Sequence, residues 1–206
     1  MPKSLAMEIL GAILASGRTF GRRQYTGPEI ERDFKVGQFD RLDLFGPIDV
    51  EVRTGRKPGV RANGREDAIE LLTVEHDGDR LEIGFDGDRG GGLEIIVSTA
   101  GLRSIRVAGS GDVTIDRVKG EQFECATNGS GDLSVDEIEV ERLKLAAVGS
   151  GDIRIDKARS TEIEASLTGS GDLAVDAIES SALKLTIDGS GDAAFEDYTG
   201  LSLIHI

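Results

Sequence analysis

Carboxylates are the residues in this sequence best placed to do chemistry, because they return at one fixed spacing. One series places an aspartate at every twentieth position: Asp112, Asp132, Asp152, Asp172 and Asp192. A second series follows four residues later: Asp116, Asp136, Asp156, Asp176 and Glu196. If equivalent residues lie on neighbouring strands about 4.8 Å apart, adjacent carboxylates repel each other by about 0.9 kcal/mol in water. Ca²⁺ prefers such oxygen ligands, which makes the first series a candidate calcium site; backbone N–H groups at turns are the alternative partners.

Paired carboxylates can also cleave glycosidic bonds, so an enzyme has to be considered. A catalytic site needs one unique arrangement of groups, whereas every repeat here carries the same set. The sequence contains no nucleophile–histidine pair, and its one histidine before the repeats, His76, is isolated. We therefore predict no catalytic residues, no cofactor and no cofactor-binding residues. A polysaccharide-acting enzyme is kept as the alternative function.

The acidic series belongs to a larger repeat, the tetrapeptide Gly-Ser-Gly-Asp, which fixes the structural unit. Glycine permits tight turns and close backbone approach, so each tetrapeptide is predicted to form a turn. Between turns, apolar and polar residues alternate from Val113 to Ile115 and from Phe123 to Thr127, which predicts two short strands separated by a break at 117–120. The predicted turn glycines are Gly109, Gly111, Gly129, Gly131, Gly149, Gly151, Gly169, Gly171, Gly189 and Gly191.

Apolar residues also recur every 20 positions, as in Ile115, Val135 and Ile155, and they can stack into one continuous core. Strands that stack in this way form parallel sheets, and parallel winding is normally right-handed. The predicted fold is an all-β, right-handed parallel β-helix, a solenoid with 20-residue coils. Ile95 and Ile105 fit the same columns shifted back by 20, so the coils are predicted to begin near Leu93.

The flanking sequence divides the chain further. A hairpin is predicted from Val74 to Phe85, around the turn Asp77-Gly78-Asp79. The predicted parts are a weak signal sequence (1–17), a linker (18–33), an irregular β-rich part that caps the coils (34–92), the coils (93–200) and a non-native tail (201–206). The tail is assigned because its six residues resemble the translation of a transposon end used in sequencing libraries.

Composition limits the possible partners. The formal net charge is −14, which argues against nucleic acid and against anionic lipid surfaces. No apolar run is long enough to span a membrane. Cys125 is the only cysteine, so no intrachain disulfide can form, and its place in an apolar column predicts a small buried side chain.

One stretch and the turns that follow it resemble a known family. The stretch is Phe-Asp-Arg-Leu-Asp-Leu-Phe-Gly-Pro-Ile-Asp-Val-Glu-Val, from Phe39 to Val52; Gly55, the strand with Leu81 and the serial Gly-Ser-Gly-Asp coils follow. Over residues 34–200 the sequence resembles the bacterial head GIN domain family, also described as "putative auto-transporter adhesins". The resemblance implies a β-helical domain exported to the periplasm, outer membrane or cell surface, and implies no catalytic residues.

The expected function is accordingly a non-catalytic envelope or surface module that binds or scaffolds. The outward rows of Ser, Thr, Asp and Arg suit a repetitive partner, such as a surface glycan or a protein. Self-association, with or without Ca²⁺ between the coils, is a further alternative, because the end of a β-helix exposes a strand edge.

Overall fold

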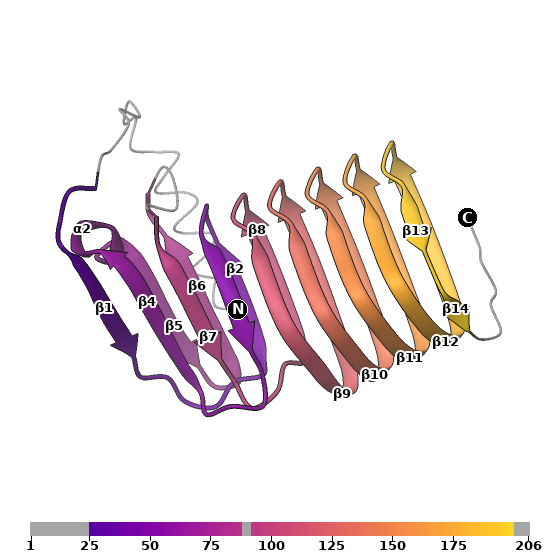
Figure 1. Cartoon of the computed structure of the whole chain (residues 1–206), viewed down its shortest axis with the longest axis horizontal. Coiled ribbons are helices and arrows are strands. Elements are labelled where there is room, and N and C mark those ends of the chain that lie inside the picture. The colour runs from indigo at the N-terminus through magenta and orange to yellow at the C-terminus, as the bar shows by residue number, and fades with distance from the viewer. Residues whose placement is uncertain (1–24, 88–91, 200–206) are drawn as a thin grey trace, which may run out of the picture.

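The computed structural model describes residues 25–87 and 92–199, and it confirms an all-β parallel solenoid (Figure 1). Its regular part is a stack of four coils that pair in parallel with an offset of 20 residues. Ile115, Val135 and Ile155 lie in one file and are at most 1% exposed. The four coils are β9 (Val113–Gly129), β10 (Leu133–Gly149), β11 (Ile153–Gly169) and β12 (Leu173–Gly189).

Each coil has three paired stretches, not the two strands predicted. In β10 they are residues 133–135, 137–140 and 142–149, interrupted where Asp136 and Glu141 have no partner across the ladder. We call these stretches, and their equivalents in the other coils, the first, middle and last faces. The predicted break at 117–120 is the middle face of β9 and is wrong, because this stretch sends its own side chain, Val118, into the core. Because only one of the four residues 117–120 points into the core, this stretch lacks the apolar–polar alternation by which a strand is recognised.

A coil from earlier in the chain is inserted into the stack. It consists of β2 (Arg41–Phe45) and β3 (Asp49–Arg53). β2 pairs in parallel with β6 (Arg80–Phe85) on one side and with β8 (Ser104–Gly109) on the other. β3 likewise lies between β7 (Glu94–Ser98) and β9. The chain therefore leaves the stack after β3, builds the end of the solenoid and returns on the other side of this coil.

The inserted coil corrects the predicted start of the repeats. Ile105 does lie opposite Cys125, 20 residues later, as predicted. Ile95 does not stack on Ile115: Val50 lies opposite both Ile95 and Val113, so Ile95 shares a column with Val113. The reason is that β3 lies between β7 and β9 in space although it is distant from both in sequence, and a repeat period cannot predict such an arrangement.

Antiparallel strands and one helical turn close the N-terminal end of the core. β1 (Glu29–Phe34) pairs with β4 (Gly59–Arg65), and β5 (Leu72–Asp77) pairs with β6 in the predicted hairpin, which is confirmed. The turn α2 (Glu66–Ile69) buries Ala68 and Ile69 completely. Figure 1 shows these elements together at the end of the stack opposite to β12.

The predicted linker 18–33 is wrong from Glu29 onward, because β1 begins there. Its charged residues hid the strand pattern, in which Ile30 and Phe34 pack against the core. The rest of that prediction up to residue 24, the predicted signal sequence 1–17 and the predicted tail 201–206 lie outside the described residues. In the described part of the chain, no helix is long and apolar enough to cross a membrane.

The far end of the stack is only partly covered. β13 (Ala193–Phe195) pairs with the first face of β12, and β14 (Tyr198–Thr199) pairs with its middle face. Within residues 25–87 and 92–199, nothing pairs with the last face of β12 on its outer side. Among the described residues the two ends of the solenoid therefore differ: antiparallel strands close the first, and β13 and β14 pair with two of the three faces at the second.

Candidate functional site

The first acidic series forms a ladder of hydrogen bonds along the turns. The backbone N–H of Asp132 donates to Oδ1 of Asp112 at 3.0 Å, and each later turn repeats this bond to the turn before it. The repeats are Asp152 to Asp132 (2.9 Å), Asp172 to Asp152 (2.8 Å) and Asp192 to Asp172 (2.8 Å). The carboxylates thus accept backbone N–H groups, the alternative to calcium that the sequence left open. A carboxylate that accepts such bonds stabilises the turn that supplies them.

The ladder begins one turn earlier than the sequence repeat shows. The N–H of Asp112 donates to Oδ1 of Asp49 at 2.9 Å, and Asp49 ends the turn Gly46-Pro47-Ile48-Asp49 of the inserted coil. Sequence analysis placed this segment in the stretch from Phe39 to Val52 and did not join it to the ladder. The first glycine and the last aspartate of Gly-Ser-Gly-Asp are both retained there, and that signal could have identified it.

Close stacking explains the glycines of the turns. A Cβ on Gly109 would overlap the carbonyl oxygen of Gly46, and a Cβ on Gly111 would overlap that of Ile48. Gly109 also has a φ of +154°, which is unfavourable for other residues. The same overlaps recur in every later turn. The sequence-predicted turn glycines therefore lie where one turn rests directly on the next.

The structure does not gather carboxylates around a common point. Among residues 25–87 and 92–199, no three His, Cys, Asp or Glu side chains form a group suited to a metal ion. The candidate calcium residues supply one carboxylate per coil, with Oδ1 of the first four already bonded to backbone. In the second series, Asp116 accepts the N–H of Thr54 at 2.9 Å and that of Arg117 at 2.6 Å, and Asp176 accepts a bond from Arg154 at 3.1 Å.

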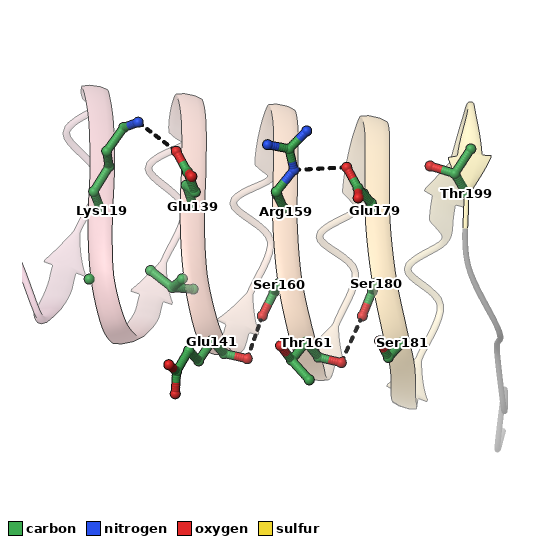
Figure 2. A pocket seen from close by; sticks show the side chains of 12 residues that line it. Lys119, Glu139, Glu141, Arg159, Ser160, Thr161, Glu179, Ser180, Ser181 and Thr199 are labelled. Atoms are coloured by element: carbon green, nitrogen blue, oxygen red, sulfur yellow. Dashed lines mark hydrogen bonds and ion pairs between the residues drawn. The ribbon is translucent and has the colours of Figure 1, made fainter.

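The middle face forms a shallow groove that crosses β9 to β12 (Figure 2). Its volume is about 770 Å³. Successive coils supply the same positions: Lys119, Glu139, Arg159 and Glu179 line one side, while Val140, Ser160 and Ser180 lie along its floor. The two serines are buried and bond to backbone, with Ser160 Oγ donating to the carbonyl oxygen of Glu162 at 2.8 Å. Sequence analysis missed this groove, because it predicted the middle face as a break.

Charges alternate along the groove. Lys119 Nζ lies 2.5 Å from Glu139, and Arg159 Nε lies 2.8 Å from Glu179. The hydrogen bond from Lys119 holds the pKa of Glu139 below its ordinary value, and the bond to Glu179 raises the pKa of Arg159. All four side chains are largely exposed, so each pair contributes little to stability. The result is a row of alternating charge along which cationic and anionic groups are both accessible.

A second alternating row runs along the last face. Its members are Glu124, Lys144, Glu164 and Lys184, one from each coil. Lys184 Nζ lies 2.7 Å from Glu164, and this bond lowers the pKa of Glu164 and raises that of Lys184. Coils that stack in register therefore favour opposite charges on consecutive coils.

Cysteine and histidine are often used in nucleophilic and acid–base catalysis, and each occurs once among the described residues. Cys125 is fully buried, as predicted, and burial raises the pKa of its thiol to about 12, so the reactive thiolate does not form near neutral pH. His76 lies on β5, where Nε2 is 3.2 Å from the carbonyl oxygen of Gln38. Neither residue lies in the groove.

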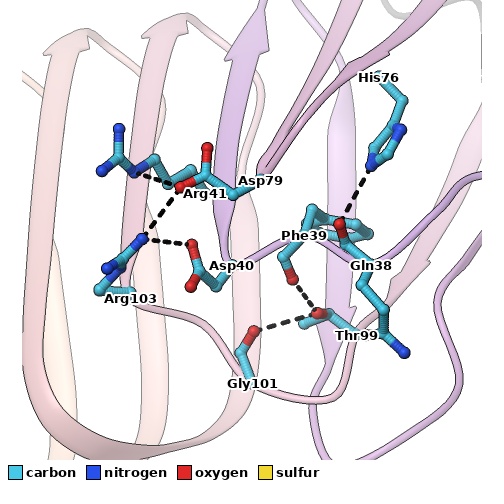
Figure 3. A network of polar contacts seen from close by, with 9 residues as sticks. All are labelled: Gln38, Phe39, Asp40, Arg41, His76, Asp79, Thr99, Gly101 and Arg103. Atoms are coloured by element: carbon cyan, nitrogen blue, oxygen red, sulfur yellow. Dashed lines mark hydrogen bonds and ion pairs between the residues drawn. The ribbon is translucent and has the colours of Figure 1, made fainter.

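A polar network fixes the point where the chain returns to the stack (Figure 3). Arg103, just before β8, contacts Asp40 at 3.0 Å and Asp79 at 3.1 Å. Thr99 is completely buried, and its hydroxyl donates to the carbonyl oxygen of Phe39 at 2.7 Å. These contacts join three segments that are distant in sequence. They hold the inserted coil in place.

Comparison with known proteins gives one family and several similar folds. The family described as "Putative auto-transporter adhesin, head GIN domain" matches residues 38–199. Among curated proteins, none matches the chain. A solved "putative adhesin" from Bacteroides fragilis is 19% identical with a TM-score of 0.63, over 89% of this chain and 100% of that one.

Two solved proteins of Parabacteroides distasonis are also similar, each 18% identical. One is named a "putative adhesin", with a TM-score of 0.57 over 87% of this chain and 94% of that one. The other is named a "putative lipid binding protein", with a TM-score of 0.52 over 86% and 97%. At these identities the likeness establishes the fold.

Proposed function

This chain belongs to the head GIN domain family, and from that premise we propose that it is a non-catalytic binding or scaffolding module of the cell envelope or surface. The family description and the names of two similar solved proteins support an adhesin-like role. The repeated surface supports it as well, since each coil presents the same kinds of group and none stands out as a reaction centre.

The observation that carries the proposal is the groove of the middle face. It crosses four coils and is lined by equivalent positions of each. Stacked strands repeat about every 4.8 Å, so contacts in the groove recur at that interval. An extended partner with its own repeating groups, such as a surface glycan or an extended protein segment, can use such contacts several times over. Weak contacts that are repeated in this way add up to useful affinity.

Ligand chemistry follows from the groups available. Lys119 and Arg159 donate hydrogen bonds, Glu139 and Glu179 accept them, and both kinds alternate along the groove. A partner rich in hydroxyl groups can bond to both kinds. Nucleic acid does not suit this surface, because the chain carries a net charge of −14.

A glycan array, with pull-down from envelope extracts, tests the proposal. The informative variant is Arg159→Ala, which removes a cation from the groove. The matched control is Arg154→Ala, which also removes one exposed arginine and its contact with Asp176, but on the first face. We expect the first to weaken binding at least several-fold and the second to leave it unchanged. If both variants bind as well as the unchanged protein, the groove is not the binding site.

The enzyme alternative is tested on the same ligands. Purified protein is incubated with acidic and neutral polysaccharides, and new reducing ends or unsaturated products are measured. We expect binding without product. Release of product that is lost in Arg159→Ala would instead establish a polysaccharide-acting enzyme.

The envelope location is tested by fractionating cells that produce the chain. We expect the protein in the periplasmic, outer-membrane or surface fraction. Recovery with cytoplasmic markers alone would contradict this part of the proposal.

A further inference from the structure

Charges on the middle face form bands that alternate in sign from one coil to the next. Each of β9, β10 and β11 places two charged side chains on the outside of this face, and β12 places one. The members are Arg117 and Lys119 on β9, Glu137 and Glu139 on β10, Lys157 and Arg159 on β11, and Glu179 on β12. Since equivalent positions pair in register, neighbouring bands lie about 4.8 Å apart, and bands of like sign recur about every 9.6 Å.

The bands are exposed enough to meet a partner. Arg117 pairs with Glu137 at 2.7 Å, and in this pair and the two already described each side chain keeps at least 36% of its surface exposed. Lys157 lies opposite Glu137 in the ladder but makes no ion pair within the described ranges. It lines a hollow that adjoins the groove and shares Glu139 and Arg159 with it. One cation beside the groove is therefore unpaired.

The spacing of the bands favours a sugar chain over a peptide. In an extended polypeptide, side chains on one side recur about every 6.7 Å, so a strand laid along the groove loses register with the bands after one contact. A pyranose unit of an extended β-linked chain advances that chain by about the spacing of one coil. Successive sugars can therefore face successive bands.

The alternation in sign determines which charges those sugars carry. A carboxylate is attracted by the bands of β9 and β11, but a second carboxylate on the next sugar would lie against Glu139 of β10. An amine-bearing sugar suits that position, because its ammonium group donates to the glutamate. A chain that alternates the two groups has no net charge, so the net charge of −14 on the protein does not repel it.

We propose that the groove of the middle face binds a zwitterionic glycan, in which carboxylate-bearing sugars alternate with amine-bearing sugars. This inference rests on the proposed function and specifies its ligand. Carboxylates of the glycan contact the bands of β9 and β11, and its ammonium groups contact Glu139 and Glu179. These contacts fix the register of the sugar chain along the stack, since a shift by one sugar places like charges together.

The probe is a fluorescent hexasaccharide of alternating glucuronic acid and glucosamine with free amines. Its N-acetylated parent is the matched control, because acetylation removes the positive charges and keeps the length, the linkages and the carboxylates. Fluorescence anisotropy measures the binding of each to the full chain at low salt. We expect the free-amine chain to bind about five-fold more tightly, the factor that two additional exposed ion pairs supply. The difference should shrink in about 1 M salt.

Substitutions in the two kinds of band should affect the two chains differently. Glu139→Gln combined with Glu179→Gln should remove the advantage of the free-amine chain without weakening the binding of its N-acetylated parent. Lys157→Gln should weaken the binding of both chains, because both carry the carboxylates. Lys144→Gln is the matched control for it, since it removes an exposed lysine from the last face, and should change neither.

Equal binding of the two chains that is lost in Arg159→Ala would overturn this inference and leave the proposed function standing. No binding of either chain would also overturn it, and the proposed function falls with it only if the glycan array shows no ligand. Tighter binding of a capped peptide of alternating lysine and glutamate would overturn it in favour of a protein segment. Dimers in light scattering that dissociate in the variant with both glutamines would overturn it in favour of a second copy.

Discussion

Oδ1 of Asp112 accepts the backbone N–H of Asp132 at 3.0 Å, so that one turn of the solenoid is bonded through a side chain to the next. The same bond links Asp49 to Asp112 and continues to Asp192. Each carboxylate of this row of like charges from Asp49 to Asp172 therefore accepts a backbone N–H from the next turn. A hydrogen bond to a charged acceptor contributes about 1.5–3 kcal/mol, which exceeds the repulsion of about 0.9 kcal/mol between two neighbouring carboxylates in water.

Removing one carboxylate from the ladder should therefore be destabilising. Asp132→Ala leaves the N–H of Asp152 without its acceptor, and we expect the free energy of unfolding to fall by about 1 kcal/mol. Urea denaturation measures it. Asp136→Ala removes an exposed aspartate four residues away and serves as the control, with a change near zero expected. An equal loss in both variants would mean that the ladder does not stabilise the turns.

The turn glycines should be far less tolerant. Gly131→Ala places a Cβ against the carbonyl oxygen of Gly111, and we expect a loss of about 3 kcal/mol or more, or failure to fold. Gly120→Ala is the matched control, because a Cβ there meets nothing within 4 Å. Circular dichroism and thermal melts compare the two. A stable, well-folded Gly131→Ala would contradict the close stacking of the turns.

The charged rows should make stability depend on pH on the acid side. Hydrogen bonds from Lys119 and Lys184 lower the pKa values of Glu139 and Glu164, whose ordinary value is 4.5. A lowered folded-state pKa contributes stability that is present above pH 4.5 and is lost as the pH falls below it. The effect should be small, because these groups are exposed, and weaker still in 1 M salt.

The measurement is urea unfolding at pH 7 and pH 3.5, at low and high salt. The unchanged protein should lose stability between pH 7 and pH 3.5, and Lys119→Met should lose less, because Glu139 no longer has its lysine partner. A pH dependence that is the same in Lys119→Met and insensitive to salt would rule out the ion pairs as its source.

Calcium is expected to have no effect on the melting temperature. Each Oδ1 from Asp112 to Asp172 already accepts a backbone N–H, and no described carboxylates converge in the number that Ca²⁺ prefers. Thermal melts with Ca²⁺ and with chelator test this. A rise in the midpoint with Ca²⁺ that disappears in Asp152→Asn would revive the calcium hypothesis.

Cys125 should resist modification while the protein is folded. Its thiol is fully buried, and burial raises its pKa to about 12. We expect no reaction with a thiol reagent at pH 8 and one thiol per chain after unfolding in guanidinium. Rapid reaction of the folded protein would indicate that the last face opens, because Cys125 lies within it.

Features that repeat within the sequence could be predicted from it, whereas features that depend on contacts between distant segments could not. The stacking of Ile115, Val135 and Ile155 was predictable because one segment recurs with the same inward positions, and slipping by one residue would turn every core side chain outward. The turn glycines were predictable for the same reason. In the candidate site, the sequence identified the aspartates of the ladder but left their partner open between metal and backbone.

The sequence by itself determined the repeat from Val113 to Gly189, its register and the residues that form its core, since these follow from periodicity alone. Only the tertiary structure decided that Val50 lies between Ile95 and Val113, and that residues 117–120 form a face with a groove. It also decided that the Asp112 carboxylate bonds to the next turn. The physical reason is that these features depend on which distant segments meet in space, and neither local alternation nor a 20-residue period carries that information.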